Sequence, residues 1–300
     1  MERNLRLDYF KLILSILIIT IHTQPLFDNS SIAGWLISNG ISRIAVPCFF
    51  IASGYFIRSK LEDNRKMKKY ILHLIIVYLI WSLIYLPTYI SEIEPRSLIT
   101  FTFIGYYHLW FLPALISGSI LLFVLKRYIK NDNILMSIAV ILFIAGYVLG
   151  YVQADYRLVC NGLIFGFPFI TIGYYLRNRK IAEKVNTYQL YSLVAISIIF
   201  LLIESYIAYR SQSYYNLFLS LIVLCPALFL SVIKGSKDKL ATDSIGKLSA
   251  GIFYIHILVI TQLIPLSTTN NFYKLPFIVA ISILISTFIL LINKRLKIFL

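Results

Sequence analysis

The sequence has 300 residues, of which 59% are hydrophobic and 14% are charged, and its formal net charge is +15. Soluble domains are about half apolar and about a quarter charged, so this composition excludes an ordinary soluble domain and indicates an integral membrane protein. The basic residues form short clusters between long apolar runs, which fits cytoplasmic loops facing anionic lipid better than a nucleic-acid-binding surface. We therefore expect a multi-pass protein of the plasma membrane.

Ten apolar runs are long enough to cross the hydrocarbon core as helices. Because backbone polar groups inside lipid must be bonded within their own segment, we expect an all-α, polytopic integral membrane protein with about ten transmembrane helices. Of the 28 Lys and Arg residues, 22 lie in alternate connecting segments and four in the others. This bias predicts that both termini are cytoplasmic. The expected spans are 9–26, 40–57, 70–90, 107–125, 134–151, 158–176, 188–207, 214–233, 248–266 and 275–293.

The first expected helix carries a polar stripe along an otherwise apolar surface. Asp8, Lys11, Ser15 and His22 fall on one helical face, and Lys11 and His22 are about 16 Å apart along the axis. Ionisable residues inside a membrane usually face the bundle interior and mark a site or a pathway. Two structural alternatives stay open: Lys11 can snorkel to the inner interface, and His22 can lie at headgroup level or bond a neighbouring helix.

Three later segments place further polar residues in apolar surroundings. "ISRIAVPCFFIASGYFIR" contains Arg43, which inside a membrane needs an anionic partner, carbonyls or water, and Ser53 near its inner end. "YYHLWFLPALISG" places His108 and Trp110 at the outer interface, where aromatic residues are common. "GKLSAGIFYIH" places His256 near mid-membrane, where its ring needs a hydrogen-bond partner. The structural alternatives are an Arg43 that snorkels to the interface and a packing role for Gly54, which follows Ser53.

Several familiar catalytic patterns are absent from the sequence. It has no phosphate-binding Gly-rich loop, no HExxH, no nucleophile elbow and no cysteine-based metal site. The cysteines, Cys48, Cys160 and Cys225, all lie in apolar runs and read as small core residues. Any chemistry must therefore use His, Lys, Arg, Asp and Ser side chains within helices.

Taken in order, these stretches resemble the membrane acyltransferase-3 family. The first helix is similar to the family's opening pattern, with Arg6, Asp8, a basic residue at 11 and, after ten more residues, His22. "SRIAVPCFFIASGYF", "HLWFLPALI" and "GKLSAGIFYIH" resemble its second-helix, Trp-Phe-Leu and Tyr-x-x-His elements. The family usually has arginine where this chain has Lys11. Lysine keeps the positive charge but lacks the planar guanidinium, which can form two parallel hydrogen bonds to a phosphate or carboxylate. "IHTQPLF" and the second-helix stretch are most similar to the membrane domains of vancomycin-resistance serine racemases, which are linked to serine supply, although we expect no racemase portion here.

The resemblance implies a single domain over 1–300 that transfers an acyl group, commonly acetyl, to a hydroxyl of a bacterial envelope carbohydrate or a related acceptor. It implies acetyl-CoA or another acyl-CoA as donor substrate and no permanently bound cofactor or metal. The expected partners are membrane lipid, the acyl-CoA and the hydroxyl acceptor, not nucleic acid; a homo-oligomer and partners in envelope biosynthesis stay open. The alternatives are a transporter of serine or a saccharide without covalent chemistry and a sensory or scaffolding membrane protein.

The predicted mechanism makes His22 the general base on the acceptor hydroxyl. Arg43 would either neutralise charge near His22 or stabilise the oxyanion of the tetrahedral intermediate. Basic residues near the cytoplasmic mouth would hold the anionic donor. The predicted site residues are, for catalysis, His22, Arg43 and Asp8; for donor binding, Lys11, Arg6 and Ser53; and for the acceptor or its channel, His108, Trp110, His256 and Ser15.

Overall fold

A computed structural model describes residues 4–90, 104–234, 244–296 and 298–300, and within these ranges the chain forms helices and their connections without a strand. Seven helical segments in this part of the chain are long and apolar enough to cross a membrane. The expected all-α, polytopic membrane protein is confirmed, while the count of ten spans and the cytoplasmic termini stay predictions. The seven segments are Ile32–Leu61, Asn64–Tyr89, Tyr107–Tyr128, Asp132–Tyr151, Thr187–Arg210, Ser244–Leu263 and Leu275–Leu296.

The first helix, α1 (Leu5–His22), begins and ends about four residues before the expected span 9–26. It begins early because the Asn4 side chain accepts a hydrogen bond from the backbone N–H of Leu7 at 3.1 Å and so caps the first turn. It ends at His22 because Gln24 precedes a proline, which disfavours helical backbone. The site histidine therefore lies at the very end of its helix.

The expected span 214–233 is shorter in the structure, where α12 covers Leu221–Ile233. The carboxylate of Glu204 accepts hydrogen bonds from the backbone N–H groups of Leu219 and Ser220, at 2.9 and 2.8 Å, and holds the preceding segment outside the helix. Thirteen residues of helix span about 20 Å, less than a hydrocarbon core of about 30 Å. By itself, α12 is too short to cross a membrane.

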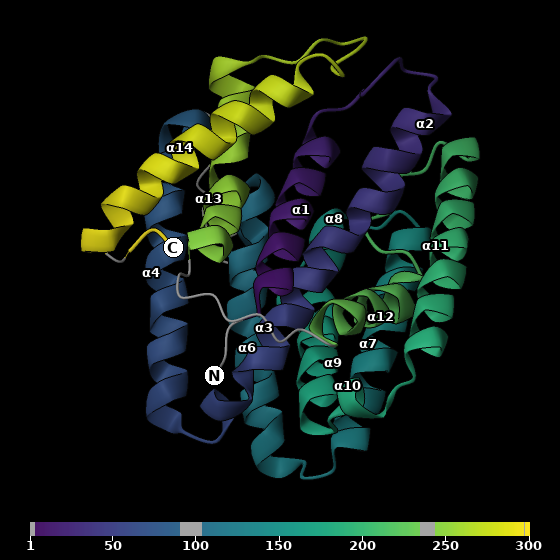
Figure 1. Ribbon diagram of the computed structural model, residues 1–300, viewed down its shortest axis with the longest axis vertical. Helices are drawn as coiled ribbons and strands as arrows, with labels where there is room; N and C mark the ends of the chain where they lie inside the picture. Colours follow the sequence, from purple (N-terminus) through teal and green to yellow (C-terminus); the bar gives the residue numbers. More distant parts are fainter. Residues whose placement is uncertain (1–3, 91–103, 235–243, 297) are drawn as a thin grey trace. The chain divides into compact units, whose positions relative to one another are not determined.

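The chain divides into two compact units. The first unit combines Met1–Phe49 with Ala182–Ile298, and the second unit is Phe50–Ile181. In the first unit α1 packs against α13, α13 against α14, and α11 against α12, and α1 and α13 lie side by side in Figure 1. The helical elements of this unit are α1, α2 (Ile32–Trp35), the π-helix η1 (Leu36–Gly40), the 3₁₀ helix η2 (Ile41–Ile44), the start of α3 (Ala45–Leu61), α10 (Ile181–Lys184), α11 (Thr187–Arg210), α12, α13 (Ser244–Leu258), the π-helix η6 (Val259–Leu263) and α14 (Leu275–Leu296).

The second unit has an aromatic core. Phe50 lies 4.6 Å from Phe111 and 5.9 Å from Phe165, measured between ring centroids, and Phe169 lies 5.5 Å from Phe165 and 5.7 Å from Phe143. Phe50 lies on α3, Phe111 on α6 (Phe111–Tyr128), Phe143 on α7 (Asp132–Tyr151) and Phe169 on α9 (Phe167–Asn178), so the ring contacts join these helices. The helical elements here are the rest of α3, α4 (Asn64–Tyr89), η4 (Tyr107–Trp110), α6 (Phe111–Tyr128), α7 (Asp132–Tyr151), α8 (Tyr156–Val159), the π-helix η5 (Gly162–Gly166) and α9 (Phe167–Asn178).

The connection between α3 and α4 is short because one carboxylate caps α4. Backbone N–H groups of Lys66 and Arg65 donate to the Asp63 carboxylate at 3.2 and 2.8 Å. These bonds favour the charged form and keep the pKa of the Asp63 carboxyl below its ordinary value. The first turns of α4 therefore carry a group of basic residues, Arg65, Lys66, Lys68 and Lys69.

Candidate active site

Two predicted site histidines meet in the first compact unit. His22 ends α1 and His256 lies in α13, fully buried, with the two ring centroids 5.3 Å apart and the rings tilted by 40°. The Nδ1–H of His256 donates to the backbone carbonyl of Phe253 at 2.7 Å. Because a carbonyl oxygen only accepts, this bond places a proton on Nδ1 of His256. The pair therefore brings together two imidazole rings, the side chains that most often exchange protons near neutral pH.

Arg43 is held beside this pair by two side-chain amides. Its Nη2 donates to Asn39 Oδ1 at 2.9 Å and its Nη1 to Asn216 Oδ1 at 3.2 Å. The guanidinium interacts electrostatically with His22, as does His256. Both bonds go to carboxamide oxygens, which hold the guanidinium in one orientation. Arginine stays positively charged in proteins, which suits a group that faces a developing oxyanion.

The backbone before α3 departs from α-helical geometry, and this departure positions Arg43. The π-helix η1 is followed by the 3₁₀ helix η2, which contains Arg43. Pro47 then lies in the first turn of α3, where its missing N–H costs little. A Cβ on Gly40 would meet the Ser205 hydroxyl of α11 at 2.8 Å, so glycine permits this close approach. Single π-turns are frequent at functional sites.

The η2 segment is also tied directly to α1. The hydroxyls of Thr20 and Ser42 are 2.6 Å apart, and Thr20 in addition donates to the carbonyl of Leu17. The side chains of Thr20 and Ser42 are both buried. Because Thr20 precedes His22 by two residues and Ser42 precedes Arg43 by one, this bond ties the backbone beside the histidine to the backbone beside Arg43.

The other end of the polar stripe lies in the first turns of α1. Arg6 is exposed, Asp8 is buried and Lys11 is half-buried. The backbone carbonyl of Lys11 accepts a bond from the Ser249 hydroxyl at 2.8 Å, and the hydroxyls of Ser15 and Ser249 are 2.7 Å apart. Ser15 is thus buried between α1 and α13, and its predicted place in an acceptor channel stays a prediction.

The remaining predicted residues belong to the second compact unit. His108 is buried, with its ring 5.1 Å from that of Tyr85. Trp110 packs edge-on against Phe165 at 5.3 Å, and Ser53 is half-buried on α3. Here the structure brings Trp110 into the aromatic core of its unit. The roles predicted for these three residues in donor and acceptor binding stay predictions.

Sequence reasoning did not identify the amides that hold the site. Asn39 Nδ2 donates to Gln24 Oε1 at 2.9 Å, and Gln24 Nε2 donates to Asn39 Oδ1 at 3.3 Å. The same Asn39 oxygen accepts the bond from Arg43. One signal was present, since Asn39 lies four residues before Arg43 and such residues meet on a helix. No local pattern marks Asn216, which lies in the connection before α12.

The fold and this group of buried and half-buried polar side chains define a polytopic helical membrane protein with a polar site inside one unit. The acyltransferase-3 family model, described as an acyltransferase domain, matches residues 4–292, and the chain belongs to this family. The resemblance noted from the sequence motifs is confirmed.

The chain is also similar to proteins that are named racemases rather than acyltransferases. It is 30% identical over 218 residues to an amino-acid racemase of Enterococcus faecalis, covering 62% of this chain and 30% of that protein. It is 28% identical over 233 residues to a serine/alanine racemase of Enterococcus gallinarum, covering 68% of this chain and 33% of that protein. A second Enterococcus faecalis amino-acid racemase matches 97% of this chain at 23% identity. The chain spans less than half the length of these relatives, and no solved structure gives a significant match.

Proposed function

We propose that this membrane acyltransferase moves an acyl group, acetyl in particular, from an acyl-CoA to a hydroxyl of an envelope carbohydrate or related acceptor at the plasma membrane. The observation that carries the proposal is the grouping of His22, His256 and Arg43 in a chain of the acyltransferase family. An imidazole can act as general base and a fixed cation can stabilise the oxyanion when a hydroxyl attacks a thioester.

In the proposed reaction His22 takes the proton of the acceptor hydroxyl as its oxygen attacks the thioester carbonyl carbon. Arg43 stabilises the negative charge that develops on the carbonyl oxygen. When the intermediate collapses, the carbon–sulfur bond breaks and the thiolate leaves, receiving the proton from His22. His256 contacts the His22 ring at 5.3 Å between centroids and supports its orientation. The products are an O-acyl ester and free CoA.

Donor binding is proposed at the other end of α1. Lys11 lies about 16 Å along the helix from His22 at 1.5 Å per residue, and an extended pantetheine arm has a length of that order. Arg6 and Lys11 would hold anionic groups of the CoA, with Asp8 pairing one of them. Asp8 lies too far from His22, about 21 Å along the axis, to act as its direct partner.

Lys11 gives the test of donor binding. A lost charge-assisted contact is worth roughly 1.5–3 kcal/mol, so we expect Lys11→Ala to weaken binding of a non-hydrolysable CoA thioester about tenfold to a hundredfold. Lys11→Arg should bind at least as tightly as the wild type, because a guanidinium grips phosphate and carboxylate well. The measurement is equilibrium binding to detergent-solubilised protein, and equal affinities in all three proteins would remove Lys11 from the site.

The names of the relatives support a second candidate, transport of serine without covalent chemistry. A serine/alanine racemase needs its amino-acid substrate, and this chain is similar to only a third of such a protein. Flux of labelled serine into proteoliposomes tests this candidate directly. Transport would proceed without acyl-CoA, whereas the proposed acyltransferase would release CoA without moving serine across the bilayer.

A further inference from the structure

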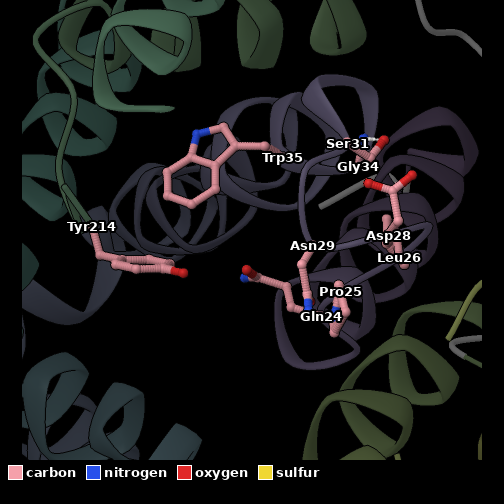
Figure 2. A pocket seen from close by; sticks show the side chains of 9 residues that line it. All are labelled: Gln24, Pro25, Leu26, Asp28, Asn29, Ser31, Gly34, Trp35 and Tyr214. Atoms are coloured by element: carbon pink, nitrogen blue, oxygen red, sulfur yellow. Dashed lines mark hydrogen bonds between the residues drawn. The ribbon is translucent and has the colours of Figure 1, made fainter. Parts of the chain in front are cut away.

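A pocket of about 300 Å³ lies beside the C-terminal end of α1, within the first compact unit. Its walls come from the segment between α1 and α2, from α2 itself and from Tyr214 in the connection before α12. Figure 2 shows the Tyr214 hydroxyl and the Gln24 carboxamide pointing toward one another, with Trp35 lining another side. Ligand pockets range from about 300 to 1,000 Å³, so this one fits a single small ring.

One wall of the pocket is aromatic and fixed in place. The indole Nε1–H of Trp35 donates to the carbonyl of Ser205 at 3.0 Å, and the Tyr209 ring packs 5.8 Å away. The ring of Tyr214 lies 4.8 Å from Trp35 at an angle of 49°. Two aromatic rings held at an angle offer flat apolar faces to a ligand at little cost in side-chain entropy.

The opposite wall supplies hydrogen-bond acceptors. Asp28 Oδ1 accepts from the backbone N–H and the hydroxyl of Ser30, at 2.9 and 2.7 Å, and the carboxylate has further acceptor capacity on Oδ2. Gln24 Nε2 donates to Ile21 and Asn39, whereas its Oε1 accepts one bond from Asn39 and retains a second lone pair. Acceptors of this kind match hydroxyl donors on a ligand.

The charge of the lining distinguishes between ligand classes. Among the described residues that line the pocket, Asp28 is the acidic one and none is basic. A free amino acid such as serine brings an ammonium group that Asp28 can pair with, but its carboxylate finds no cation in the lining. A neutral ring bearing hydroxyls brings no such unpaired charge.

We propose that this pocket binds one neutral, polyhydroxylated ring, a sugar residue of the acyl acceptor, and this assignment rests on the proposed acyltransferase function. The aromatic wall covers the apolar face of the ring, while Asp28 and Gln24 accept its hydroxyls. Gln24 connects the pocket to Arg43 through one side chain, Asn39, and follows His22 by two residues. A bound ring is thereby placed next to the proposed base and oxyanion group.

The test is ligand-observed NMR titration of the detergent-solubilised full chain with methyl glucoside, glucuronate and L-serine as probes. We expect methyl glucoside to bind and the anionic glucuronate to bind more weakly. Tyr214→Ala should weaken methyl glucoside binding by about tenfold through loss of the aromatic face. Tyr188→Ala is the matched control, because Tyr188 is also an exposed tyrosine and does not line the pocket.

Asp28→Asn distinguishes a role of Asp28 in ligand binding from a purely structural role. Removing the carboxylate should raise the affinity for glucuronate relative to methyl glucoside, because the like-charge repulsion disappears. Equal binding of methyl glucoside to wild type and Tyr214→Ala, absence of binding, or preference for L-serine would each overturn the sugar pocket. Sugar binding with this pattern in a protein that never consumes acyl-CoA would uphold the pocket and reject the acyltransferase function.

Discussion

His22→Ala is expected to lower the rate of acyl transfer by about 10²–10⁴-fold, the usual loss when a general base is removed. His22 ends its helix and is only partly buried, so the substitution leaves the α1–α13 contact and the Ser15–Ser249 bond in place. The measurement is the rate of CoA release by purified protein in liposomes that contain an acceptor-bearing membrane extract. Binding of the non-hydrolysable CoA thioester should remain unchanged, because the donor phosphates are proposed to lie at the other end of α1.

His73→Ala is the matched control for this experiment. His73 is an exposed histidine on α4, in the other compact unit, and no proposed step uses it. We expect wild-type turnover from this variant. Turnover near the wild-type level in His22→Ala would show that His22 is structural and that the proposed proton transfer is wrong.

Gly173→Ala is expected to destabilise the second compact unit by about 3 kcal/mol or more. A Cβ at Gly173 would lie 2.1 Å from the backbone carbonyl oxygen of Ile51 and 2.8 Å from the backbone nitrogen of Tyr55. Gly54 faces the same crossing, where its Cβ would lie 2.0 Å from the carbonyl oxygen of Ile170. Backbone atoms cannot rotate away, so α3 and α9 must separate and the aromatic core between them must loosen.

Gly150→Ala controls for the intrinsic effect of alanine in a helix. No atom lies within 4 Å of a Cβ added at Gly150 on α7, so alanine should be neutral or stabilise the protein by up to about 1 kcal/mol. In thermal unfolding of the detergent-solubilised protein, Gly173→Ala should lower the apparent melting temperature by roughly 6 °C or more. Equal melting temperatures for the two variants would contradict the close helix crossing.

Much of the fold could be predicted from hydropathy because long apolar runs leave few alternatives. The expected spans 134–151 and 188–207 correspond to α7 and α11 within a few residues. The region before Arg43 could not be predicted, because η1 and η2 depend on the close approach of Gly40 to α11 rather than on a local pattern. The short α12 likewise follows from a distant carboxylate, Glu204, that bonds the backbone before it.

The site could be predicted in part. The polar stripe pointed to His22 by helical spacing, and the polar residues inside later apolar runs pointed to Arg43 and His256. Their proximity depends on the packing of α1 against α13, which joins residues 234 positions apart in sequence. Asn216 and Tyr214 could not be predicted to act together with α1, since they lie in a connection that shows no periodic pattern.

The most direct test follows labelled acetyl groups from acetyl-CoA in liposomes containing the purified chain and an envelope carbohydrate extract. We predict that the chain releases CoA and that an equal amount of label appears in the carbohydrate fraction as an alkali-labile ester, with both signals lost in His22→Ala and kept in His73→Ala. Absence of CoA release and of labelled ester, in a preparation that carries labelled serine across the bilayer, would contradict acyl transfer and establish transport instead.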